Sequence, residues 1–145
     1  MKYYNAENYD PASSIGLSLS RARNLLAREM DAAIRDLDIN HQHLGIIMAL
    51  GRKMADTPLE LSRMLEIDTG LMTRMLDRLE KQEVLQRVRS VDDRRSVNLQ
   101  LTRHGKQMVE KIAQRAPDVL NARLKDFSAS EFREFQRLLL KFIDA

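Results

Sequence analysis

Between residues 57 and 102 the spacing of the apolar residues changes from the period of a helix to the period of a strand. The stretch TPLE at 57–60 predicts a helix start, because its threonine and glutamate form a capping box around a proline suited to the first helical position. Residues 66–68 interrupt the helical pattern, and a second helix is predicted from about Thr69 to Gln82. Two short helices separated by a tight turn are typical of a helix–turn–helix.

The segment that follows is predicted to be an antiparallel hairpin, with strands at residues 84–91 and 96–102. In the second strand, Asn98 and Gln100 alternate with apolar residues, which indicates one buried and one wet face. The apolar positions are Val97, Leu99 and Leu101. The tip, DDRR at 92–95, contains no glycine or asparagine, so local turn chemistry does not explain its sequence. A helix–turn–helix followed directly by a hairpin is a winged helix.

Longer helices are predicted at both ends of the chain. Residues 13–37 carry an apolar stripe with helical spacing, wide enough that part of it is expected to bury against a second subunit. Asn40 is predicted to cap the next helix. Thr102 is predicted to cap a later helix that Pro117 should kink or break near Arg115. The capping box SASE at 128–131 should open the last helix.

The expected fold is therefore mainly α-helical, with a small two- to three-stranded antiparallel wing. We divide the chain into an N-terminal arm (1–12), a winged helix–turn–helix (41–102) and a region of flanking helices (13–40 and 103–145). The flanking helices carry the expected dimer contacts, namely Ile15, Leu19, Phe132, Phe135, Leu139 and Phe142.

Composition narrows the functional classes. The chain has no cysteine, which excludes disulfides and thiolate metal sites. It has no apolar run of the roughly 20 residues that span a bilayer and no signal-peptide pattern, so we expect a cytoplasmic protein that contacts no membrane. Its three histidines form no catalytic or metal constellation, and we predict no enzyme activity, metal or cofactor.

Positive charge is concentrated in the wing. Residues 86–106 contain six Lys and Arg against two Asp, a local charge of +4, whereas the whole chain carries +3. A local basic patch on a near-neutral chain indicates a polyanion site, although an ordinary solvated face has the same composition.

The exposed face of the second short helix supplies candidate base contacts. Thr69, Gly70 and Thr73 permit close approach to DNA, Arg74 can reach phosphate or guanine, and Leu71 can touch a thymine methyl group. On the wing, an arginine at the tip can enter the minor groove beside a carboxylate that orients it. The predicted wing contacts are Arg87, Arg89, Asp93, Arg94 and Arg95, the first two to phosphates.

Two stretches carry a family resemblance. The sequences LMTRMLDRLEKQEVLQR (71–87) and DDRRSVNLQLTRHGK (92–106) resemble the recognition helix and wing of the MarR family of regulators. Asp93 and Arg95 match the D-x-R of its wing, and Leu101, Thr102 and Gly105 match its L-T-x-x-G. Glu83 stands where many members have glycine, so the exit from the recognition helix is expected to differ.

The resemblance implies a homodimer that binds a pseudo-palindromic operator in double-stranded DNA as a repressor. It also implies release by a small aromatic carboxylate bound between the dimerisation region and the winged helix. Arg21 and His43 are the candidate partners of that carboxylate, with Leu44 and Met48 as apolar walls. An ion-paired Arg21 and a solvated His43 fit the sequence at least as well, and nothing in the sequence excludes a ligand-insensitive or architectural DNA-binding protein.

Overall fold

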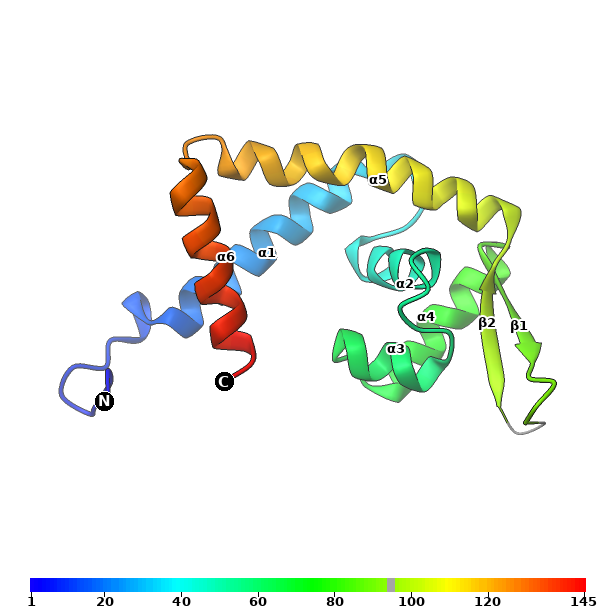
Figure 1. The fold of residues 1–145 in the computed structure, drawn as a ribbon, viewed down its shortest axis with the longest axis horizontal. Coiled ribbons are helices and arrows are strands. Elements are labelled where there is room, and N and C mark those ends of the chain that lie inside the picture. Colours follow the sequence, from blue (N-terminus) through cyan, green and yellow to red (C-terminus); the bar gives the residue numbers. More distant parts are fainter. Residues whose placement is uncertain (94–95) are drawn as a thin grey trace.

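A computed structural model describes residues 1–93 and 96–145, which form six α-helices and one two-stranded antiparallel sheet (Figure 1). The elements are α1 (Ile15–Ala33), α2 (His41–Gly51), α3 (Pro58–Leu65), α4 (Thr69–Lys81), β1 (Leu85–Arg89), β2 (Val97–Leu101), α5 (Arg103–Leu124) and α6 (Ala129–Ile143). Short 3-10 turns lie at Pro11–Ser13 and Arg35–Leu37. The order confirms the predicted winged helix–turn–helix between flanking helices.

Side-chain caps determine where the helices start. Asn40, Thr57, Thr102 and Ser128 each accept a backbone hydrogen bond from the first turn of the helix that follows, as predicted. Asp68 does the same for α4. Each cap pairs an N–H group that has no partner inside its helix, and such a cap typically contributes about 1 kcal/mol.

Two glutamates end helices in the left-handed conformation. Glu66 (φ 52°) turns the chain between α3 and α4, and Glu83 (φ 57°) turns it from α4 into the wing. After each, the next N–H group reaches back five residues, from Ile67 to the carbonyl of Ser62 and from Val84 to that of Leu79. The prediction that Glu83 alters the exit is therefore wrong, because the glutamate adopts the conformation that glycine favours, at a cost of about 1 kcal/mol.

The wing is a two-stranded hairpin in register from Leu85 opposite Leu101 to Arg89 opposite Val97. The expected wing had two or three strands, and the described residues form two. On the outer side of β2, in place of a third strand, the Leu99 N–H donates one hydrogen bond to the Asp56 carbonyl at 2.7 Å. Leu99 is buried and Leu101 is half-buried, but Val97 is exposed, so the predicted buried face holds only near the base of the hairpin.

The turn at the wing tip has a local explanation that the sequence analysis missed. The hydroxyl of Ser90 accepts hydrogen bonds from the N–H groups of Asp92 and Asp93, both at 3.3 Å. Serine hydroxyls support turns in this way. Local turn chemistry therefore operates here without glycine or asparagine.

The hydrophobic core lies within the winged part and at the helices that contact it. Its fully buried side chains include Ile34, Ile46, Ile47, Leu61, Met72, Leu76, Leu79, Leu85 and Ile112. By contrast, α1 and α6 contain no buried residue, although both carry many apolar side chains. Figure 1 shows these two helices and the far half of α5 extending away from the wing, with both termini at that end. No helix in the described part of the chain is long and apolar enough to cross a membrane.

Of the kink or break expected at Pro117, the break does not occur: α5 runs from Arg103 to Leu124 as one helix with the proline inside it. Proline removes one hydrogen bond, the one that the Ala113 carbonyl would otherwise accept. Ala113 and Pro117 are both exposed, so water can solvate that carbonyl and the helix continues.

Two arginines of α5 hold α1 and the turn that follows it. Arg123 pairs with Glu29, and Arg115 pairs with Asp36 at 3.0 Å and also donates to the Ala33 carbonyl. These hydrogen bonds lower the pKa of the Glu29 and Asp36 carboxyl groups. These contacts thus fix α1 and the turn after it to α5.

Three segments meet at the carbonyl of Val84: the end of α4, the base of the wing and the start of α5. That carbonyl accepts a hydrogen bond from the Thr102 N–H at 3.0 Å, while the Thr102 hydroxyl caps α5 through the Gly105 N–H. A Cβ atom added to Gly105 would lie 2.1 Å from the same carbonyl oxygen. Thr102 and Gly105 of the L-T-x-x-G pattern therefore serve packing at this junction.

We predict that Gly105→Ala lowers the free energy of unfolding by about 2–3 kcal/mol, because backbone must move to admit the methyl group. Gly16→Ala is the matched control, since nothing lies within 4 Å of its added Cβ and it stands in the first turn of α1. Urea denaturation of both variants measures the effect. Equal stability of Gly105→Ala and the wild type would show that the junction is not tightly packed.

Candidate nucleic-acid interface

The exposed face of α4 carries four of the five predicted base contacts. Met72, Met75, Leu76 and Leu79 are buried, which turns Thr69, Gly70, Thr73 and Arg74 outward. The Thr73 hydroxyl donates to the Thr69 carbonyl at 2.8 Å. Leu71 is half-buried and packs against the core, so it is less available than the other four.

Arg74 lies over the smallest residue of this face. A Cβ atom on Gly70 would stand 3.8 Å from the Arg74 guanidinium. The absence of a side chain at Gly70 therefore leaves the first turn of α4 flat beside an exposed arginine. A flat helix start next to a forked cation is a surface that fits the floor of a major groove.

The two arginines of β1 differ in their surroundings. Arg89, at the end of the strand, is exposed. Arg87 donates to Asp77 at 2.7 Å and to Glu80, both on α4, and only 28% of its side chain is accessible. Burial alone would lower the pKa of Arg87, but the bonds to both carboxylates outweigh it and raise the pKa. The predicted phosphate contact of Arg87 takes no account of this internal pairing.

At the wing tip, Asp93 is exposed and its carbonyl accepts a hydrogen bond from the Ser96 N–H at 2.9 Å. Arg94 and Arg95 lie outside the described residues, so their predicted groove contacts and the orienting role of Asp93 stay predictions.

A link between α4 and the α1–α2 connector also escaped the sequence analysis. The Gln82 amide donates to the carbonyl and the carboxylate of Asp38, at 3.0 and 2.9 Å, and Arg78 approaches the same carboxylate at 3.6 Å. Asp38 itself is left-handed (φ 54°). The partners lie 44 residues apart in the chain, and no local pattern relates them.

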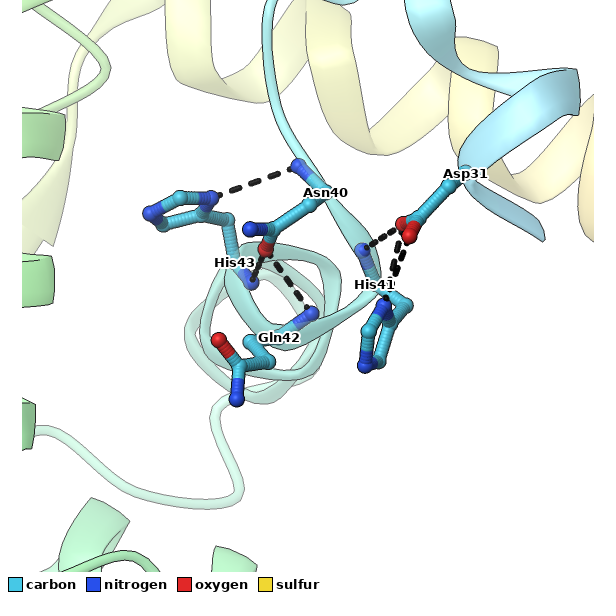
Figure 2. Close-up of polar contacts among 5 residues, drawn as sticks. All are labelled: Asp31, Asn40, His41, Gln42 and His43. Carbon is cyan, nitrogen blue, oxygen red and sulfur yellow. Dashed lines mark hydrogen bonds and ion pairs between the residues drawn. The ribbon is translucent and has the colours of Figure 1, made fainter. Parts of the chain in front are cut away.

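Figure 2 shows that the two histidines of α2 point to different sides of the helix. His43 is buried, and its Nδ1 accepts the Asn40 N–H at 3.3 Å while Asn40 caps the His43 N–H, so the pair forms a capping box. His41 turns toward α1, where its Nδ1 lies 3.0 Å from both carboxylate oxygens of Asp31. His43 therefore has a structural role at the helix start.

The four predicted ligand residues do not share one cavity. Arg21 and His41 line an open groove of about 1020 Å³ along α1. Met48 borders a separate groove of about 690 Å³ lined by the end of α2, by α5 and by the start of α6. Leu44 is half-buried against the core, and His43 belongs to the cap. The histidine that accompanies Arg21 is thus His41, which the sequence analysis did not choose.

The predicted dimer contacts are largely exposed in the single chain. The accessible fractions are 50% for Ile15, 40% for Phe132, 49% for Phe135 and 56% for Phe142. Leu19 and Leu139 are half-buried. Large apolar side chains left exposed on two terminal helices are of the kind that a soluble chain covers with a partner.

The described residues hold no group of three or more His, Asp or Glu side chains that could bind a metal ion. An exposed recognition helix beside a basic hairpin, supported by a helix–turn–helix core, defines a winged helix–turn–helix regulator. The MarR family model matches residues 39–97. The multiple antibiotic resistance protein MarR of Salmonella typhimurium is 31% identical over 117 residues, 80% of this chain and 81% of that protein. The chain belongs to the MarR family.

Other relatives agree. PecS, a helix–turn–helix transcriptional regulator of Dickeya dadantii, is 30% identical over 133 residues, which are 90% of this chain and 80% of PecS. Among solved structures, a cysteine-to-serine mutant of Escherichia coli MarR in complex with operator DNA gives a TM-score of 0.81 at 27% identity, covering 96% of this chain and 99% of that one. These relatives are transcriptional regulators and not enzymes.

We predict that protonation of His43 destabilises the protein. Burial lowers the pKa of His43, and the charge of Arg78 acts in the same direction. Because the folded-state pKa lies below the unfolded value of about 6.5, the unfolded chain takes up the proton first as the pH falls. The stability from neutral His43 is complete above pH 6.5 and is lost below it, with a slope of at most about 1.4 kcal/mol per pH unit.

The measurement is urea unfolding between pH 7.5 and 5.5. His43→Gln keeps an acceptor for the Asn40 N–H and should flatten the slope, whereas His104→Gln, at an exposed position, should not. An unchanged slope in His43→Gln would show that another group titrates.

Proposed function

We propose that the protein is a homodimeric repressor that binds a pseudo-palindromic operator. The observation that carries this proposal is the exposed α4 face of Thr69, Gly70, Thr73 and Arg74 beside the basic hairpin. The relative with operator DNA, at 27% identity over nearly the whole of both chains, supports operator binding. A regulator of this kind acts in the cytoplasm, where the chromosome is accessible.

The apolar faces of α1 and α6 support the proposed dimer. A single winged helix reads one half-site, and two copies related by a two-fold axis read a palindrome. Burying Phe132, Phe135 and Phe142 against a second copy would remove the largest exposed apolar side chains of α6 from water. Such an interface resembles a domain core cut in half.

We further infer a small anionic effector, with an aromatic carboxylate as the first class to test. The groove along α1 is lined by Arg21, Asn24 and Arg28, and by His41, which is paired with Asp31. The fold also matches that of Bordetella bronchiseptica BpsR (TM-score 0.83, 21% identity), whose DNA binding is regulated by 6-hydroxynicotinic acid. That acid belongs in the test panel. A ligand-insensitive DNA-binding protein is the alternative.

We predict that Arg74→Ala loses discrimination among operator variants by about 1–3 kcal/mol at the base that Arg74 reads. The operator is obtained by selection from random duplexes with the wild-type protein, and binding is measured by fluorescence anisotropy. Arg133→Ala, at an exposed position on α6, is the matched control and should bind as the wild type does. If no duplex is enriched, or if Arg74→Ala keeps the full preference, the proposed reading of DNA by α4 is wrong.

The effector prediction is a weaker operator complex in the presence of benzoate- or pyridine-carboxylates. A ligand weakens DNA binding only by the difference between its affinities for the two conformations, typically 1–3 kcal/mol. Titration into a preformed complex, with melting temperatures measured in parallel, tests it. If no acid shifts either quantity at millimolar concentration, the ligand-insensitive alternative holds.

A further inference from the structure

Arg87 connects the two parts of the DNA-binding surface. It stands on β1, opposite Leu99 of β2, at the base of the wing. Its guanidinium donates through one terminal nitrogen to Asp77 and through the other to Glu80. The two carboxylates are three residues apart on α4, so they lie on the same side of the recognition helix.

The charges of this cluster argue against a phosphate contact. One cation faces two carboxylates, so the cluster carries no net positive charge with which to attract DNA. Both terminal nitrogens of Arg87 are engaged, and 28% of its side chain is accessible. A phosphate would have to compete with two carboxylates that already form charge-assisted hydrogen bonds to the guanidinium.

The same geometry suits a structural link, here called a brace, that holds the wing against α4. The wing is a two-stranded hairpin, and an isolated hairpin of this size is only marginally stable and orders itself by packing. Val97, near its tip, is 36% exposed, so apolar burial supports mainly the base. A forked guanidinium restricts orientation more than a single-point contact does, because its donors lie in one rigid plane.

We propose that Arg87 is a positioning residue that sets the angle between the wing and the recognition helix through Asp77 and Glu80. It carries no base or phosphate contact of its own. Its effect on DNA is indirect, since it holds the wing tip at the minor groove while α4 occupies the major groove. This inference rests on the proposed DNA-binding function and adds to it the device that aligns the two contacts.

The decisive variant is Glu80→Gln, which leaves the charge of Arg87 in place. If Arg87 braces the wing, loss of a carboxylate loosens the wing, and the preference for A·T-rich over G·C-rich flanks falls roughly tenfold, as for the loss of one charge-assisted contact. If Arg87 instead binds phosphate, the same change frees the arginine, removes a negative charge near DNA and strengthens binding. For a duplex with A·T-rich flanks, the brace account thus predicts weaker binding by Glu80→Gln, and the phosphate account predicts stronger binding.

Arg87→Gln should match Glu80→Gln in lowering the flank preference, and Arg87→Lys should recover part of it because one ammonium reaches one carboxylate. Discrimination at the base read by Arg74 should stay unchanged in all three, which separates a brace from general loss of folding. Glu110→Gln, an exposed position on α5, is the control for removal of a negative charge.

Hydrogen exchange without DNA gives a second readout that is independent of the operator. The amides of β1 and β2 should exchange faster in Glu80→Gln and Arg87→Gln, while those of α2 should not change. Unaltered exchange in the wing, or tighter DNA binding by Glu80→Gln, would overturn the proposal. A failure to select any duplex would refute the proposed function, and the exchange rates would still decide whether Arg87 braces the wing.

Discussion

The close approach of Gly105 to the Val84 carbonyl is the constraint on which the DNA-binding part depends. Three segments meet there: the end of α4, the base of the wing and the first turn of α5. The Thr102 hydroxyl lies 2.5 Å from the Glu83 carbonyl and also accepts the Gly105 N–H, so one side chain joins the exit of the recognition helix to the start of the long helix. Because no Cβ atom fits at Gly105, the base of the wing, the exit of α4 and the start of α5 are closely packed at this point. The brace that we propose at Arg87 would set the angle at which the rest of the wing leaves this junction.

A second set of contacts joins the recognition helix to the region that we expect to form the dimer. The connector between α1 and α2 is held by Arg115 of α5 through Asp36 and by Gln82 of α4 through Asp38. Buried Ile34 and Ile39 anchor it from within. A shift of α1 against α5 would therefore reach the last turn of α4 through one short segment. Such a segment could carry coupling between the proposed effector groove and α4 if it has two discrete arrangements.

Much of the fold could be predicted from local patterns, since caps, periodicity and turn residues act over a few positions. Thr57 and Ser128 fixed helix starts, and the alternation around Leu99 identified the wing. The failures share a cause. The brace at Arg87 and the Gln82–Asp38 link join elements through space, and periodicity does not encode them. At Pro117, exposure decided the outcome, and His43 took a cap position that glutamate or glutamine usually occupies. The predicted ligand residues do not line one cavity. A cavity depends on how helices pack, and the sequence spacing of Arg21, Leu44 and Met48 does not determine that packing.

The central claim is that two copies of this winged helix read one DNA site through α4 and the wing. The most direct measurement is a hydroxyl-radical footprint on the selected operator, combined with the mass of the complex in solution. The account predicts two chains per duplex and two protected half-sites related by a two-fold axis, with centres about one helical turn, or roughly 34–36 Å, apart. Minor-groove protection should flank each half-site where the wings lie. A single chain bound to one half-site, or uniform protection without two-fold symmetry, would contradict it.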